Sequence, residues 1–119
     1  MRNNTLGHLY SDGEIIIRQG SVGDCFYVIQ EGIVEIVDES GNADVIVAVL
    51  GETDFFGEMG LFEKDVRSCT VRAKGDAKVL TMDKKSLYKS IQKDPSLAFR
   101  LLEKMSNRLR ETTRQLGVK

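Results

Sequence analysis

A carboxylate and a guanidinium stand at the two ends of one stretch of this chain that is rich in glycine and aromatic residues. Glu58 lies within Phe56–Phe62, and Arg67 begins the run Arg67–Thr70. We expect a short helical segment between them, whose first backbone N–H groups favour an anion. The planar fork of Arg67 suits phosphate oxygens. Glu58, when ionised, accepts hydrogen bonds from hydroxyls such as those of a ribose. A sugar and a phosphate together indicate a nucleotide.

The same stretch also has an ordinary structural interpretation. Its apolar side chains can fill a core without any ligand; they are Phe55, Phe56, Met59, Leu61 and Phe62. Arg67 can equally be an unpaired surface charge, and Glu58 a solvated one. On local spacing alone, a nucleotide site and a plain core segment both stay open.

The elements that position this stretch are expected to form a single domain, because 119 residues build one core but not two. Hydrophobic content of 41% and a single proline argue against disorder. A net charge of −1 gives no overall attraction to nucleic acid or to an acidic membrane. The longest apolar run, Val45–Leu50, is too short to cross a bilayer, and the N-terminus lacks a signal peptide's apolar core. We therefore expect a cytoplasmic protein without a membrane partner.

Metal and disulfide chemistry have little support in the sequence. Cys25 and Cys69 lie in strand-like runs and are predicted to be small buried thiols; a disulfide between them is the alternative. His8, the only histidine, lies in a polar lead-in and is expected to be solvated, so a His-rich metal site is hard to build. We expect no metal.

The first three-quarters of the chain is predicted to be β structure. Short runs rich in β-branched and aromatic residues alternate with turn residues, which is typical of a sandwich or a jelly-roll-like barrel. The predicted strands are Glu14–Arg18, Cys25–Gln30, Ile33–Val37, Val45–Leu50, Cys69–Ala73 and Val79–Asp83. Turns are expected at Ser11–Gly13, Gly20–Asp24, Glu31–Gly32, Ser40–Asn42, Gly51–Glu52 and Lys74–Asp76.

The last quarter is predicted to be helical. Asp83 is expected to cap a helix over Lys84–Lys93, and Pro95 to open a second helix that runs to about Leu116. Its apolar residues fit a 3-4-3-4 seam if one threonine is included: Leu102, Met105, Leu109, Thr112 and Leu116. Two interpretations stay open. The helix packs only on its own barrel, or one face packs there while the seam pairs with a second subunit.

The wider pattern resembles the cyclic nucleotide-binding domain family from about Tyr10 to the end of the chain. The matching segments are Gly13-Glu14, Gln19-Gly20, Gly23–Ile29, Gly32, Asp54–Glu58 and Arg67–Val71. The resemblance implies a mainly β fold with C-terminal α structure: a double-stranded β-helix, or jelly-roll, barrel at about 10–83, containing a phosphate-binding cassette, and two helices at about 84–116. It assigns the ribose 2′-hydroxyl to Glu58 and the cyclic phosphate to Arg67. Backbone amides at Gly57 to Met59 and at Ser68 would complete the cradle.

Within the family, the cassette is most similar to that of bacterial cAMP-dependent transcription activators. This similarity implies that Val47 and Val49 line the purine side of the pocket. It also makes Thr112 and Thr113 candidate base contacts, one from each subunit of a homodimer; for Thr112, filling the helix seam is the alternative. The chain departs from the pattern in three ways. Val66 replaces a frequent proline, the cassette is slightly shorter, and the helix that usually precedes the barrel is largely absent.

We therefore expect a regulatory sensor module that binds cyclic AMP (cAMP), with cyclic GMP (cGMP) as the weaker candidate. It carries no nucleophile paired with a base and no Gly-x-x-x-x-Gly-Lys phosphate loop, so neither catalysis nor a triphosphate ligand is expected. Signalling is expected to pass through movement of the C-terminal helices to a protein partner whose identity is unknown. The chain stops at Lys119 without a recognition helix, so no direct DNA binding is expected. The alternatives are the sensory fragment of a CRP/FNR-type transcription regulator, or a degenerate barrel that serves as an interaction domain.

Overall fold

The computed structural model describes residues 7–58 and 65–117, with Asp65 described by its backbone alone. The chain forms two compact units that divide between Lys84 and Lys85. The strands of the first unit are β1 (His8–Tyr10), β2 (Ile15–Ile17), β3 (Val22–Gly23), β4 (Phe26–Asp38), β5 (Val45–Leu50), β6 (Phe55–Phe56), β7 (Asp65–Val66) and β8 (Thr70–Met82). The helices are α1 (Lys84–Lys93) and α2 (Ser96–Gln115).

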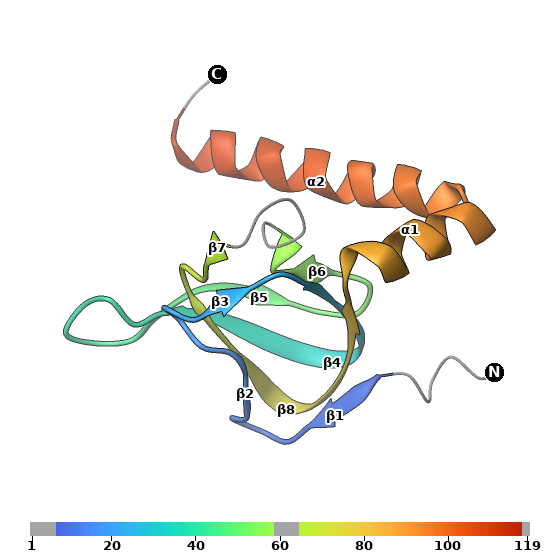
Figure 1. Cartoon of the computed structure of the whole chain (residues 1–119). Coiled ribbons are helices and arrows are strands. Elements are labelled where there is room, and N and C mark those ends of the chain that lie inside the picture. The colour runs from blue at the N-terminus through green and yellow to red at the C-terminus, as the bar shows by residue number, and fades with distance from the viewer. Residues whose placement is uncertain (1–6, 59–64, 118–119) are drawn as a thin grey trace. The chain divides into compact units, whose positions relative to one another are not determined.

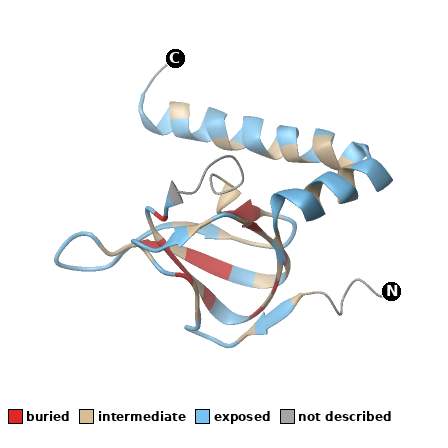
Figure 2. Ribbon diagram, in the orientation of Figure 1, coloured by how far each residue is buried: buried red, intermediate tan, exposed pale blue. Residues whose placement is uncertain are grey.

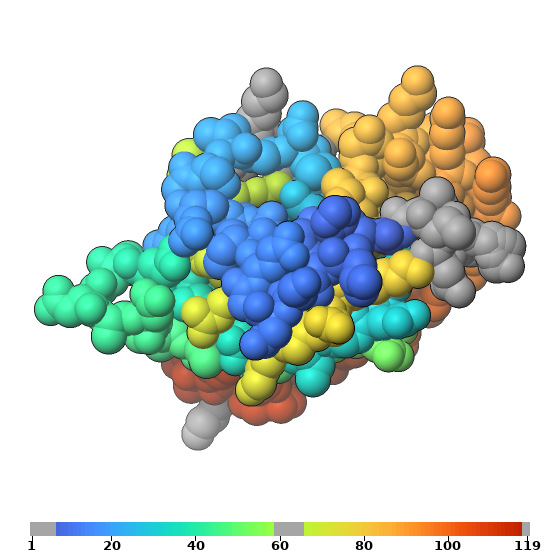
Figure 3. All heavy atoms as spheres, turned by 90° about the horizontal axis from the view of Figure 1, so that it is seen from below, coloured from blue at the N-terminus to red at the C-terminus, as the bar shows by residue number. Residues whose placement is uncertain are grey.

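Two long strands, β4 and β8, form the centre of the strand unit (Figure 1). They pair with each other, and the sheet runs in the order β1-β8-β4-β5, with β2 added to β8 and β6 added to β4. Strands β3 and β7 form a separate two-stranded ribbon. Seen from below, the segment that carries β1 and β2 lies across β8 (Figure 3). All these pairings are antiparallel, and they confirm the predicted mainly β jelly-roll fold with two C-terminal helices.

Two predicted turns are wrong because each lies inside a continuous strand, and a third, Gly20–Asp24, contains the short strand β3. Glu31–Gly32 falls within β4, and Lys74–Asp76 falls within β8, where the pairing register shifts. Gly32 has a φ of 89°, and a Cβ there would lie 2.9 Å from the Cα of Ala77. Glycine is therefore needed at this point for close approach of two paired backbones, not for a chain reversal.

The core is formed by side chains of the two long strands, β4 and β8, and of the strands that pair with them. Buried residues gather on β4, β6 and β8, whereas no residue of the described helices is buried (Figure 2). The apolar core cluster consists of Ile17, Ile29, Val34, Phe56, Val71, Ala73, Ala77 and Val79. Cys25 and Cys69 are both free cysteines, and they are half-buried instead of buried as predicted. His8 is exposed at the start of β1.

The helical unit begins and ends where the sequence predicts. The carboxylate of Asp94 accepts hydrogen bonds from the backbone N–H of Ser96 at 3.2 Å and from its hydroxyl at 2.6 Å. Together with Arg100, these bonds hold the pKa of Asp94 below its ordinary value. Pro95 occupies the cap position of α2 with a φ of −57°. Gly117, with a φ of 75°, follows the last turn, as is common where a helix stops.

The four most exposed apolar side chains of α2 and its C-cap residue follow one line along the helix, which we call the α2 apolar line. They are Phe99, Leu102, Leu109 and Leu116, with Ser106 and Thr113 at the intervening positions. The predicted seam shares three of these residues, but Met105, 38% exposed, is less open to solvent than they are. The line keeps the 3-4 spacing of a helix pair, so a contact between helices is geometrically sound for this face.

Candidate functional site

Arg67 is held by the strand unit as a buried cation. The residue is 8% exposed. Its Nη1 donates to the carbonyl of Gly57 at 2.9 Å, and its Nη2 donates to the carbonyl of Cys25 at 2.7 Å. Toward the described residues these bonds use two of the five guanidinium N–H donors. The interpretation of Arg67 as an unpaired surface charge is therefore wrong.

The main chain of Arg67 is fixed as firmly as its side chain. Its N–H donates to the carbonyl of Ser21 at 2.7 Å, and its carbonyl accepts from the N–H of Gly20 at 2.8 Å. These bonds continue the β3–β7 ribbon, in which Val22 pairs with Val66. The segment before β3 therefore sets where the arginine leaves the backbone.

Two glycines make room for the guanidinium. A Cβ on Gly23 would lie 2.6 Å from the Nε and 2.7 Å from the Cζ of Arg67, which is closer than real contacts allow. A Cβ on Gly57 would lie 3.1 Å from the Nη1 of Arg67, and Gly57 also has a φ of 77°. In the sequence, Gly23 is recognisable only as part of the motif Gly23–Ile29. Its role depends on pairing between β3 and β7, which leaves no local signature.

Tyr27 forms one wall beside the arginine. Its ring stacks on that of Phe56, with centroids 5.1 Å apart and an interplanar angle of 11°. The thiol of Cys25 lies 3.8 Å from the Tyr27 hydroxyl. Burial, and then the contact with Cys25, raise the pKa of Tyr27 to about 12, while the positive charge of Arg67 acts in the opposite direction. The phenol is therefore neutral at physiological pH.

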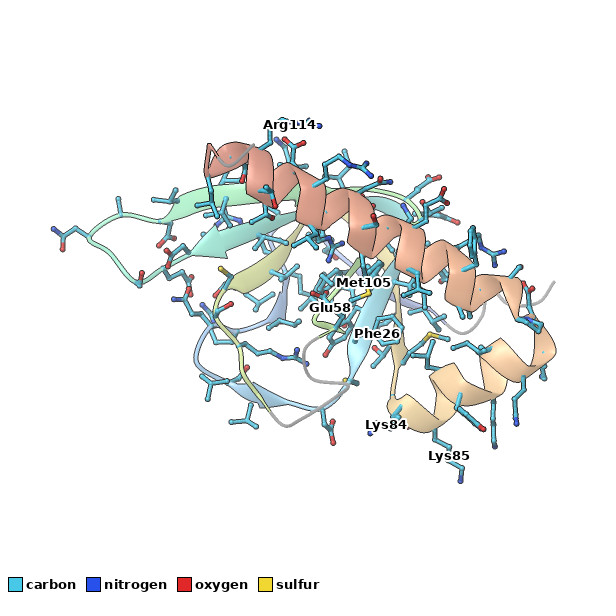
Figure 4. All side chains as sticks on the ribbon, turned by 90° about the horizontal axis from the view of Figure 1, so that it is seen from above. Phe26, Glu58, Lys84, Lys85, Met105 and Arg114 are labelled. Carbon is cyan, nitrogen blue, oxygen red and sulfur yellow. The ribbon has the colours of Figure 1, made fainter. Side chains whose placement is uncertain are left out.

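Glu58 directly follows the carbonyl that binds Arg67. It is half-buried and lies two residues beyond the end of β6; its side chain is labelled in Figure 4. The carboxylate and the guanidinium are therefore tied to the same short segment through Gly57. The predicted contact Met59 and the expected helical segment fall largely outside the described residues.

The other predicted contacts lie in less enclosed places. Ser68 follows Arg67 and is exposed. Val47 and Val49 are 53% and 56% exposed. They are alternate residues of β5, the strand at one edge of the sheet. Thr112 and Thr113 belong to the helical unit, and the hydroxyl of Thr112 donates to the carbonyl of Arg108 at 3.0 Å. The strand unit thus brings Gly57, Glu58, Arg67 and Ser68 together, and the threonines form a separate group.

The arrangement is chemically suited to binding an anion. A buried guanidinium whose carbonyl partners leave three N–H donors for other acceptors suits a phosphate, and a neighbouring carboxylate suits hydroxyl donors.

Among residues 7–58 and 65–117, no group of three or more His, Cys, Asp and Glu side chains is placed to hold a metal ion. Within those same ranges, no helix is long and apolar enough to span a membrane.

The fold and the buried arginine place the chain in a class of proteins: β-barrel modules that contain a buried arginine side chain and are followed by two helices. A family profile described as the cyclic nucleotide-binding domain matches residues 8–94. The chain belongs to the cyclic nucleotide-binding domain family. The match confirms the resemblance found in the motifs around Glu58 and Arg67.

Known relatives and structures agree with this membership. The chain is 35% identical over 113 residues to the "cAMP-activated global transcriptional regulator CRP" of Salmonella typhimurium, covering 92% of this chain and 53% of that protein. It is 42% identical over 76 residues to the "cAMP-dependent protein kinase regulatory subunit" of Schizosaccharomyces pombe, covering 64% of this chain and 18% of that protein. Catabolite Activator Protein of Thermus thermophilus superposes with a TM-score of 0.78 at 28% identity, covering 96% of this chain and 55% of that one. The chain thus spans about half of CRP and under a fifth of the kinase subunit.

Proposed function

We propose that this chain is a regulatory module that binds a cyclic nucleotide, cAMP in preference to cGMP. The observation that carries the proposal is the buried guanidinium of Arg67, which the carbonyls of Gly57 and Cys25 hold in place. A cyclic phosphate carries one negative charge, which one arginine neutralises. A nucleoside triphosphate requires more cations and a dedicated phosphate loop.

In this proposal each predicted contact has one role. Arg67 binds the cyclic phosphate and Glu58 accepts a hydrogen bond from the ribose 2′-hydroxyl. Ser68 and the backbone N–H groups around Gly57 and Met59 complete the phosphate cradle. The apolar side chains of Val47 and Val49 contact one face of the purine. Their partial exposure leaves them accessible to such a ligand.

The preference for cAMP is supported by the similarity to two relatives, a cAMP-dependent protein kinase regulatory subunit and a cAMP-activated transcriptional regulator. Thermal denaturation with cAMP, cGMP and 5′-AMP tests it. Ligand at 100 times its Kd raises the unfolding free energy by about 2.7 kcal/mol, so a clear rise in Tm is expected with cAMP. The rise should be smaller with cGMP at equal concentration and absent with 5′-AMP. No rise with either cyclic nucleotide would instead favour a degenerate barrel that serves for protein interaction.

We also propose a homodimer through the α2 apolar line, with Thr112 and Thr113 contacting the base from the two subunits. The supporting observation is the exposure of Leu102, Leu109 and Leu116 at helix-pair spacing. Sedimentation of the wild type is expected to show a dimer, and Leu109→Lys a monomer. Lys89→Leu, a surface change on α1, is the control and should sediment like the wild type. A wild-type chain that stays monomeric up to high concentration contradicts the proposal.

Signalling is proposed to pass through α1 and α2 to a partner protein, because a module without catalysis acts by shifting conformations. Addition of cAMP is expected to change hydrogen exchange within Ser96–Gln115. Unchanged exchange there, at saturating cAMP, rules out this route.

A second candidate is the sensory part of a longer transcription regulator. The supporting observation is that the chain spans 53% of the Salmonella CRP protein. An open reading frame that continues past Lys119 into a helix-turn-helix would establish this candidate. A stop codon directly after Lys119 would exclude it.

A further inference from the structure

A cluster of polar side chains surrounds Thr70 at the start of β8. Thr70 is 1% exposed, which is unusual for a hydroxyl. Its Oγ1 accepts a hydrogen bond from the backbone N–H of Gln19 at 3.0 Å and donates to Oε1 of Glu39 at 2.5 Å. The buried hydroxyl thus has both a donor and an acceptor partner, so the site is fully satisfied.

The side chain of Gln19 ties the same region to the end of β4. Its Oε1 accepts from the backbone N–H of Glu39 at 2.7 Å, and its Nε2 donates to Oδ1 of Asp38 at 3.3 Å. Arg18 adds an ion pair to Glu39 at 3.3 Å. Three segments distant in sequence therefore meet here: residues 18–21, the end of β4, and the first residue of β8.

Residues 18–21 also hold the main chain of Arg67. The backbone N–H of Gly20 binds the carbonyl of Arg67, and the carbonyl of Ser21 binds its N–H. The turn itself is closed on Arg18, whose carbonyl accepts from the N–H and the hydroxyl of Ser21. The N–H that binds Thr70 and the N–H that binds Arg67 thus belong to adjacent residues.

We propose that Gln19, Thr70 and Glu39 are positioning residues for the phosphate-binding arginine. The proposal rests on the proposed function, since it concerns the affinity of Arg67 for a cyclic phosphate. None of these three described residues is hydrogen-bonded to the guanidinium; they fix the turn at residues 18–21, which is hydrogen-bonded to the main chain of Arg67. A guanidinium fork binds phosphate with defined geometry, so a displaced backbone weakens binding even when the arginine is present.

Calorimetric titration of the full chain with cAMP tests this role through Thr70→Val, which keeps the shape of the side chain and removes its hydroxyl. We expect about tenfold weaker binding, because the N–H of Gln19 loses its buried acceptor. Thr70→Ser retains the hydroxyl and should bind within about twofold of the wild type. Thr81→Val, an exposed position on the same strand, is the matched control and should also bind like the wild type.

A double-mutant cycle with Arg67→Lys separates positioning from general loosening of the barrel. If the cluster acts through the arginine fork, Thr70→Val changes affinity by less than about twofold in the Arg67→Lys background. An equal loss in both backgrounds, or wild-type affinity in Thr70→Val, overturns the proposal. Gln19→Ala serves in the same cycle if Thr70→Val does not fold.

A ligand-independent measurement keeps this proposal distinct from the proposed function. The Nε–Hε signal of Arg67 in an NMR spectrum of ¹⁵N-labelled protein, assigned by its loss in Arg67→Lys, reports the place of the guanidinium. It should shift in Thr70→Val and stay in place in Thr70→Ser and Thr81→Val. An unshifted signal in Thr70→Val overturns the positioning role even if the wild type binds no cAMP.

Discussion

The two ends of the proposed site differ in how far the strand unit encloses and hydrogen-bonds their side chains. At the phosphate end, Arg67 is 8% exposed and its guanidinium is bound to two carbonyls. At the proposed base end, Val47 and Val49 are more than half exposed on β5, at one edge of the sheet. The difference follows from the chemistry of the two contacts. A charged fork must be aimed in advance to bind well, whereas apolar contact with a flat ring tolerates small displacements.

Arg67→Ala breaks the comparison at its stronger end and should have the largest effect. Removal of one partner from a buried, hydrogen-bonded charge pair costs about 2–5 kcal/mol of binding free energy. The substitution also leaves the carbonyls of Gly57 and Cys25 without a donor, so the free energy of unfolding should fall by about 1–3 kcal/mol. Calorimetry with cAMP and chemical denaturation measure the two effects.

The matched control is Lys74→Ala, which removes an exposed cation on β8. It should leave cAMP affinity unchanged. Unchanged affinity in Arg67→Ala, in a protein shown to be folded, would refute the phosphate role.

Gly23→Ala sharpens the comparison by moving the arginine without removing it. A Cβ at this position would lie 2.6 Å from the Nε of Arg67, so the guanidinium must shift. Overpacking of this kind costs about 1–3 kcal/mol, and we expect a loss of binding free energy in that range. Gly51→Ala is the control, because a Cβ there meets no atom within 4 Å. Equal cAMP affinities of the two variants would show that the guanidinium has a second productive position.

Val49→Ala tests the base end, where a smaller effect is expected. Each buried methylene contributes about 0.8 kcal/mol, and a half-exposed valine gains only part of that on binding a purine. The loss of cAMP affinity should therefore stay below about 1 kcal/mol. Val45→Ala, at an equally exposed position on β5, should have no effect. A loss as large as that of Gly23→Ala would mean that the base end is organised as tightly as the phosphate end.

The features that the sequence predicts depend on local signals, and those that it does not predict depend on tertiary contacts. Strand-like runs, glycine turns and the Pro95 helix start are local signals, and they are enough for the jelly-roll class and both helices. The sequence does not show that Gly32 lies inside β4, because a glycine needed for close approach of backbones looks like a turn residue. The exposed line of α2 also differs from the predicted seam at Met105, since exposure depends on tertiary packing.

At the site, Glu58 and Arg67 could be proposed from residue type and spacing alone. The partners of Arg67 could not, because backbone carbonyls have no sequence signature and that of Cys25 lies 42 residues away. The same holds for the bond between Thr70 and Gln19, which are 51 residues apart. The residue types that give a site its chemistry can be inferred from the local sequence. The hydrogen bonds that orient those side chains join residues far apart in the chain.

The ionisation of Tyr27 gives the prediction with the smallest expected effect, a pH dependence of the free energy of unfolding that tests the phosphate end. Burial raises the pKa of Tyr27 from 10.0 to about 12 in the folded chain. The folded state thus binds the phenolic proton more tightly than the unfolded state does. The resulting stability is fully present below pH 10 and is lost as the pH rises toward 12. The ring is only half-buried, so solvent reduces the contribution to below about 1 kcal/mol.

Denaturation at pH 9 and at pH 12 measures this term by comparison with Tyr27→Phe, which has no phenolic proton. The wild type should lose more stability than Tyr27→Phe between these two values, because the two proteins differ only in the phenolic group of Tyr27. Tyr88→Phe, at an exposed position in α1, should behave like the wild type. Equal pH dependence of Tyr27→Phe and the wild type would mean that water reaches the Tyr27 hydroxyl freely. The wall beside Arg67 would then be as open as β5, and the contrast between the two ends would rest on hydrogen bonds alone.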